Sequence, residues 1–149
     1  DLVRSRGLGD VYKRQVLMHR VAVWMSYKQQ PSRNLQFPYD AQSPTLKKKI
    51  TYTEEVLWEE IARLVEESKD GKFTLGAALY YSLVFCADST YFLTPETIFA
   101  LEEYMSMKRF NLPLAKTIDD ADYHRLVIFS AIDEEFNALQ NEDIKKQNG

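Results

Sequence analysis

Apolar side chains dominate one stretch of the chain, Leu75–Cys86, which contains no charged residue. A helix drawn through this stretch is apolar on every side, and such a helix is either buried by its neighbours or placed in a membrane. Its twelve residues make a helix of roughly 18 Å, whereas the hydrocarbon core of a bilayer is ~30 Å thick. The pattern therefore predicts a buried central helix over about Thr74–Ala87, with Leu79, Leu83 and Phe85 in the core.

The segment before this stretch has apolar positions at the three- and four-residue spacing of an amphipathic helix. Two starts are compatible with its first residues. Thr51 has capping-box spacing to Glu54, whereas a start at Thr53 places Tyr52 and Leu57 as a hydrophobic staple. The stripe predicted to face the core consists of Leu57, Trp58, Ile61, Leu64 and Val65. The polar face predicted for the same helix consists of Glu54, Glu55, Glu59, Glu60, Arg63, Glu66 and Glu67.

A third helix has the clearest start in the chain. Thr94 is its predicted N-cap, Pro95 takes the first helical position, and Glu96 meets the positive end of the helix dipole. Asn111 and Pro113 are expected to end it. The residues expected to face inward are Ile98, Leu101, Tyr104 and Met105.

A fourth helix is predicted to follow Thr117 as its cap, with Asp119 and Asp120 in the first turn. Its apolar positions, spaced by three and four, are Leu126, Phe129, Ile132, Phe136 and Leu139. The tail Asn141–Gly149 is polar, and we expect it to fray.

The N-terminal third is harder to assign. Val16–Tyr27 fits a helix or a strand, since periodicity does not arbitrate over so short an apolar run. Gln29–Lys49 contains three prolines, which block a helix and a central strand, so we expect an extended connector there. The predicted fold class is all-α: a four-helix antiparallel bundle or an irregular helical array, with an extended N-terminal segment. The predicted organisation is a basic, proline-containing segment over residues 16–50, a helical domain over 51–140 and a polar tail over 141–149.

Composition bounds the class of protein. A chain of 149 residues with 45% apolar and 28% charged residues suits one globular domain. Cys86 is the single cysteine and cannot form an internal disulfide, so nothing indicates a secreted, disulfide-stapled scaffold. No stretch has the pattern of a signal peptide. The cytoplasm is therefore the expected compartment, and no membrane association is expected.

Charge is unevenly distributed along the chain. Residues 16–50 carry six basic residues against Asp40, a net charge of +5, whereas residues 51–149 carry a net charge of −10. Such asymmetry is typical of a nucleic-acid-binding arm, but also of a basic segment that lies across its own acidic body. The candidate nucleic-acid contacts are Arg33, Lys47, Lys48 and Lys49, where lysines would neutralise phosphates.

Candidate chemistry is sparse. Asp120 and His124 are four residues apart and so share one helix face, where a carboxylate and an imidazole can ligate a metal. A metal site needs three or four ligands, and only this pair has suitable spacing; acidic residues are also common at helix N-termini for dipole reasons. Cys86 lies in the most apolar stretch, where burial makes a thiol inert. No G-x-S-x-G motif and no Walker-type loop occurs.

Residues 1–15 read DLVRSRGLGDVYKRQ. This string closely resembles a peptide that recurs at the ends of unrelated open reading frames in assembled environmental sequence, where it is translated adaptor or library sequence. The resemblance implies a non-native N-terminal segment in a metagenomic fragment, and we expect that segment to add nothing to stability. Two alternatives stay open: the native chain begins at Met25, or it continues upstream of the break. No protein family is recognised over residues 16–149.

The expectation for function follows from these observations. We expect a small cytoplasmic helical interaction or accessory protein without catalytic activity and without a cofactor. Its partner is expected to be a protein, which the sequence does not identify, and the oligomeric state stays open. The alternatives are a nucleic-acid-associated protein that uses the basic N-terminal arm and a metal-dependent enzyme.

Overall fold

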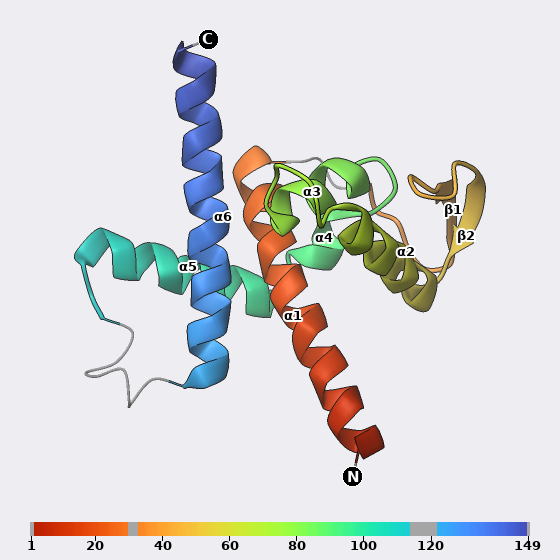
Figure 1. The fold of residues 1–149 in the computed structure, drawn as a ribbon, viewed down its shortest axis with the longest axis horizontal. Coiled ribbons are helices and arrows are strands. Elements are labelled where there is room, and N and C mark those ends of the chain that lie inside the picture. Colours follow the sequence, from red (N-terminus) through yellow and green to blue (C-terminus); the bar gives the residue numbers. More distant parts are fainter. Residues whose placement is uncertain (1, 30–32, 114–121, 149) are drawn as a thin grey trace.

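The computed structural model describes residues 2–29, 33–113 and 122–148 (Figure 1). The fold is mostly helical, as predicted, but the four-helix antiparallel bundle is not confirmed. In chain order the elements are α1 (Leu2–Lys28), β1 (Tyr39–Gln42), β2 (Lys49–Tyr52), α2 (Glu54–Glu67), α3 (Leu75–Leu83), α4 (Ser89–Phe92), α5 (Pro95–Phe110) and α6 (Tyr123–Asn148).

The helix at the centre of the fold is α1. Figure 1 shows it running obliquely through the molecule, with α2, α3, α4 and the strands on one side and α6 on the other. It contacts α3, α4, α5 and α6, and all five side chains of Val21–Met25 are buried. An uninterrupted buried run is possible because neighbours cover the helix on more than one side. Of the two alternatives left open for Val16–Tyr27, the structure has the helix.

The predicted central helix is present in shortened form as α3. Leu79 and Leu83 are fully buried, as predicted. The chain turns at residues 84–86, where Cys86 N–H donates to the Leu83 carbonyl at 3.1 Å. The prediction for Phe85 is wrong, since this side chain is 75% exposed. It lies in the turn and no longer follows the periodicity of the helix.

The strands depart from the expected connector. β1 and β2 pair antiparallel with Tyr39 opposite Tyr52, and Ser43 N–H donates to the Lys48 carbonyl at 2.8 Å to close the turn. Pro38 precedes β1 and Pro44 lies in the turn, so neither removes a ladder hydrogen bond. The prolines were expected to exclude a helix and a central strand, and both strands of this two-stranded sheet are edge strands. The short hairpin itself was not predicted.

The start of α2 follows the second of the two predicted alternatives. Thr53 is the N-cap, and its Oγ1 accepts a hydrogen bond from the Val56 N–H at 3.2 Å. Tyr52 and Leu57 are both buried, in agreement with a hydrophobic staple. Thr51 instead belongs to β2, where its hydroxyl donates to Asp40 Oδ1 at 2.6 Å.

In α5 the predicted start is confirmed and part of the predicted inner face is wrong. Thr94 Oγ1 accepts from the Thr97 N–H at 3.2 Å, and Pro95 opens the helix. Leu101 and Tyr104 are buried as expected. Ile98 and Met105, seven residues apart and so on the same flank of α5, are 42% and 54% exposed.

We predict that Thr94→Ala lowers the free energy of unfolding by about 1 kcal/mol, the usual cost of losing a side-chain cap. Thr94→Gly is expected to cost less, because glycine tolerates the non-helical geometry of this position. Thr94→Ser keeps the hydroxyl and serves as the control. Urea denaturation followed by circular dichroism measures all three; a neutral alanine variant contradicts the cap.

The last helix, α6, begins at Tyr123, and the predicted cap Thr117 lies outside the described residues. Phe129, Ile132 and Leu139 are buried, as predicted. α6 continues to Asn148, and the expected fraying of the polar tail stays a prediction. Glu142 holds this part of the helix against α1 by accepting from Lys28 Nζ at 3.4 Å.

No helical break marks the end of the adaptor-like segment, because α1 continues through residue 15. Its last residues contact the body of the protein. Arg14 Nη2 lies 3.6 Å from Glu55 Oε2, and its guanidinium lies 5.0 Å from the centroid of the Trp58 ring. The expectation that residues 1–15 add nothing to stability stays a prediction, to be weighed against these contacts.

Candidate functional site

Only one member of the predicted metal pair lies within the described residues. Asp120 lies outside the described residues, whereas His124 is exposed in the first turn of α6. Its ring meets Tyr12 of α1 edge-on, with the ring centroids 4.5 Å apart. Over residues 2–29, 33–113 and 122–148, no three His, Cys, Asp or Glu side chains are grouped as a metal site requires. Asp120 and His124 stay a prediction.

The predicted nucleic-acid contacts lie in two places. Lys47, Lys48 and Lys49 are exposed at the turn of the hairpin and the start of β2. Arg33 is exposed too, but its Nη1 donates to the Phe85 carbonyl at 2.6 Å. Arg33 is therefore attached to the turn after α3, whereas the three lysines lie on the hairpin.

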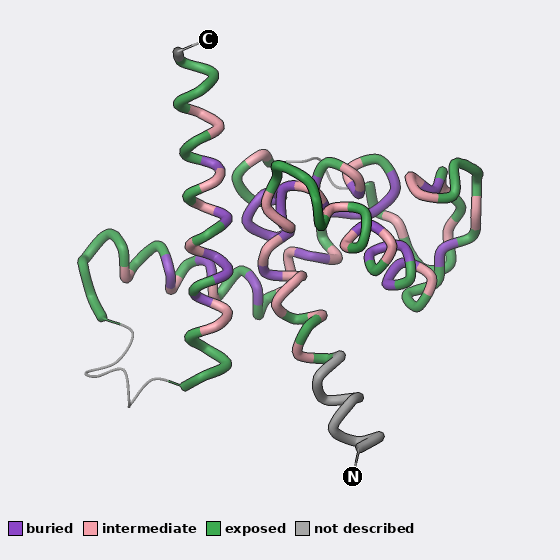
Figure 2. Tube along the Cα trace, in the orientation of Figure 1, coloured by how far each residue is buried: buried purple, intermediate pink, exposed green. Residues whose placement is uncertain are grey.

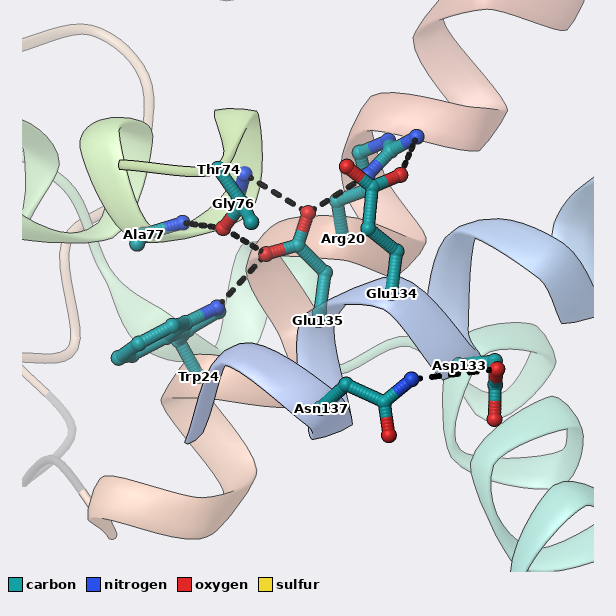
Figure 3. A network of polar contacts seen from close by, with 9 residues as sticks. All are labelled: Arg20, Trp24, Thr74, Gly76, Ala77, Asp133, Glu134, Glu135 and Asn137. Carbon is teal, nitrogen blue, oxygen red and sulfur yellow. Dashed lines mark hydrogen bonds and ion pairs between the residues drawn. The ribbon is translucent and has the colours of Figure 1, made fainter. Parts of the chain in front are cut away.

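A fully buried carboxylate, Glu135 of α6, joins three helices (Figure 3). Its Oε2 accepts from Arg20 Nη1 at 2.7 Å and from the Gly76 N–H at 3.1 Å. Its Oε1 accepts from Trp24 Nε1 at 2.9 Å and from the Thr74 hydroxyl. A buried charge is tolerated when an opposite charge and hydrogen bonds satisfy it, and here both oxygens are satisfied.

The close approach of α3 to this carboxylate requires a glycine. A Cβ added at Gly76 would lie 2.5 Å from Glu135 Cδ and 2.7 Å from the Arg20 carbonyl oxygen. Both distances are below ordinary van der Waals contact, and the second involves backbone that cannot rotate away. Gly76 therefore lets the N-terminus of α3 meet α1 and α6 at one point.

A second fully buried carboxylate, Glu60, ties the hairpin to α2. It accepts from the hydroxyls of Ser43, Thr45 and Tyr52, the last at 2.8 Å, and Arg63 Nη2 lies 3.3 Å from its Oε2. Burial alone would raise the pKa of Glu60, but the three hydroxyl donors and the charge of Arg63 together lower it. The prediction that Glu60 lies on a solvated face is wrong.

Cys86 has the environment of a structural thiol. It is buried, and desolvation raises the pKa of its thiol to about 11. The thiolate is the reactive form, and a thiol with this pKa is almost entirely protonated at neutral pH. The expectation of an unreactive cysteine agrees with this environment.

A group of exposed apolar side chains lies on α5 and just beyond its C-terminal cap. Five large side chains, which we call the α5 surface, are 42–67% exposed: Ile98, Phe99, Met105, Phe110 and Leu112. Figure 2 shows the outer part of α5 mostly as exposed chain, in contrast to the buried centre of α1. Scattered exposed apolar residues are normal, but five within fifteen positions form a patch of the kind that marks a binding surface.

A groove adjoins this surface where α1, α5 and α6 meet. Its volume is about 410 Å³, and it is lined by Gln15, His19, Glu96, Phe99, Ala100, Glu103, Arg125, Ile128 and Phe129. Phe99 of the α5 surface stands at this groove, and Glu103 pairs with Arg125 inside it. His19 is buried there, with its Nδ1 2.6 Å from the Gln15 carbonyl.

Comparison of the chain with models of protein families, with curated proteins and with solved structures finds no match. Among the described residues, no helix combines the length and the apolar character needed to cross a bilayer.

Proposed function

We propose that this chain is a small, non-catalytic interaction or accessory protein of the cytoplasm, built as an irregular helical array, that binds a protein partner through the α5 surface. The observation that carries the proposal is the exposure of five large apolar side chains on one helix and its cap. Residues 1–15 enter this proposal as translated adaptor or library sequence without a role in function.

The composition of the α5 surface supports a protein partner. Aromatic side chains and methionine are enriched at protein interfaces, and a few such residues near the centre of an interface provide most of its binding energy. Phe99 and Phe110 are the largest members, at 67% and 62% exposure. The groove beside Phe99 offers a pocket of about 410 Å³ for an anchoring side chain from the partner.

The buried carboxylates support a role without catalysis. Each oxygen of Glu135 and of Glu60 has two partners within the protein. A carboxylate held in this way has no lone pair directed at a substrate, so it stabilises the fold instead. The nucleic-acid alternative keeps one supporting observation, the exposure of the three lysines at the hairpin.

Peptide display tests the proposal. A library of amphipathic helical peptides is selected against the protein, with the double variant Phe99→Ser/Phe110→Ser as counter-target and Phe85→Ser as the matched control. Phe85 is equally apolar and 75% exposed, but lies outside the α5 surface. We expect peptides that bind the wild type and the Phe85 variant and lose roughly tenfold or more in affinity for the double variant, as is usual for hot-spot residues.

Peptides that bind all three proteins equally would place the binding surface elsewhere and contradict the proposal. A selection that enriches no peptide contradicts it as well. Far-ultraviolet circular dichroism of the double variant verifies that it is folded, which is expected because both phenylalanines are exposed.

A further inference from the structure

We infer that the partner of the α5 surface is a second copy of this chain, whose α5 lies antiparallel to the first across a two-fold axis beside Met105. This inference depends on the proposed function, since it names the partner of the same surface. In an isologous interface, the same patch on each copy must be complementary to itself. The sequence of α5 meets that requirement in both its apolar and its charged positions.

The apolar positions are arranged symmetrically about Met105. An axis at this residue brings Ile98, seven positions before Met105, towards the partner's Leu112, which is seven positions after Met105 and follows the left-handed cap Asn111. It also brings Phe99 within one position of the partner's Phe110. Every member of the α5 surface then meets another member, and the partner's Phe110 reaches the groove beside Phe99.

The charges are arranged in the complementary sense. Before Met105, α5 carries Glu96, Glu102 and Glu103, and its last turn carries Lys108 and Arg109. An antiparallel partner therefore sets acidic residues against basic ones, whereas a parallel partner would set like charges together.

Two of these charges are available for the partner. Glu103 pairs with Arg125 within the chain, and Lys108 Nζ lies 3.2 Å from Asp133 Oδ1. Glu102 and Arg109 are exposed, and neither forms an ion pair with another residue that the structure describes. Arg109 only lies over the neighbouring Phe110 ring, 5.4 Å from its centroid. The axis beside Met105 places Glu102 next to the partner's Arg109.

The exposed area is sufficient for a stable dimer. Taking ~200 Å² for the full surface of each large side chain, the exposed fractions of the five members amount to roughly 560 Å² of apolar surface. A standard interface buries about 800 Å² on each partner, of which roughly 450 Å² is apolar. The α5 surface therefore supplies the apolar area that one side of such an interface needs.

Sedimentation equilibrium of charge-swap variants tests the inference. The wild type is expected to reach twice the 17.4 kDa mass of the chain at high micromolar concentration. Glu102→Arg sets two arginines together and Arg109→Glu sets two glutamates together, so each is expected to weaken self-association roughly tenfold or more. The double variant Glu102→Arg/Arg109→Glu restores opposite charges and is expected to dimerise again. Glu59→Arg, an exposed residue on α2, is the control for the charge change alone.

If the wild type keeps a mass of 17.4 kDa over the whole concentration range, the inference that the partner is a second copy is overturned. If either single variant self-associates as strongly as the wild type, the antiparallel arrangement is overturned. The same holds if the double variant does not recover the self-association of the wild type. The peptide selection separates this failure from that of the proposed function. A monomer that still binds peptides through Phe99 and Phe110 rejects only the second copy, whereas a monomer that binds no such peptide rejects both.

Discussion

Glu135→Leu is expected to lower the free energy of unfolding by about 3–5 kcal/mol, the usual loss when one partner of a buried ion pair is removed. The Arg20 side chain, only 16% exposed, would lose the carboxylate that neutralises it. Trp24 Nε1–H and the Gly76 N–H would lose their acceptor in the same change. Unsatisfied buried donors add to the cost, because their desolvation is no longer offset.

The neighbouring residue provides the matched control. Glu134 also accepts from Arg20, through Nη2 at 3.0 Å, but its side chain is 55% exposed. Glu134→Leu is therefore expected to cost no more than about 1 kcal/mol, as for other exposed ion pairs. Glu135→Gln keeps an acceptor oxygen and should fall between the two, which keeps the test informative if the leucine variant does not fold. Equal losses at the two positions in urea denaturation would refute the buried network.

The second large effect is expected in α3. Leu83→Ala removes a fully buried side chain and should cost about 2–5 kcal/mol, the range for leucine truncation in a core. Phe85→Ala, two residues further on, should change stability by less than about 0.5 kcal/mol, because surface substitutions rarely do more. The contrast follows from the end of the helix at Leu83, after which Phe85 is 75% exposed.

Chemical denaturation of the two variants at matched protein concentration measures this contrast. Comparable losses would mean that Phe85 packs in the core after all and that α3 continues through it. A loss under half a kcal/mol for Leu83→Ala would instead refute the burial of α3.

Features with local causes could be predicted from the sequence. The caps Thr53 and Thr94 were predictable because the donor that each satisfies lies three residues away. The burial of Leu79 and Leu83 followed from a stretch without charge. The helix starts and part of the core are therefore encoded within single segments.

Features that depend on distant partners could not be predicted in this way. From sequence alone, a glutamate is expected at the surface. The burial of Glu60 becomes evident only when the fold places Ser43 and Tyr52 beside it. Glu135 depends on Arg20, 115 positions away. The hairpin was missed for a related reason, since its prolines exclude strand interiors but not turns.

The candidate site was missed because periodicity alone does not say which apolar flank a fold covers. Ile98 and Met105 have the spacing of core residues, but α5 buries Leu101 and Tyr104 instead. The α5 surface becomes evident only from the exposure of these two side chains in the structure. A helix with apolar residues on more than one flank is a sequence signal for this arrangement, and α5 has it.

The pairing of the first helix with the last affects how the chain folds as it is synthesised. Arg20 meets Glu135 only after the chain has grown by another 115 residues, which takes roughly 6–23 s at typical elongation rates. During that interval the apolar run Val21–Met25 has emerged without α6 to cover it. We therefore expect this apolar run to be exposed on the nascent chain, and accessible to a chaperone, until α6 has been synthesised.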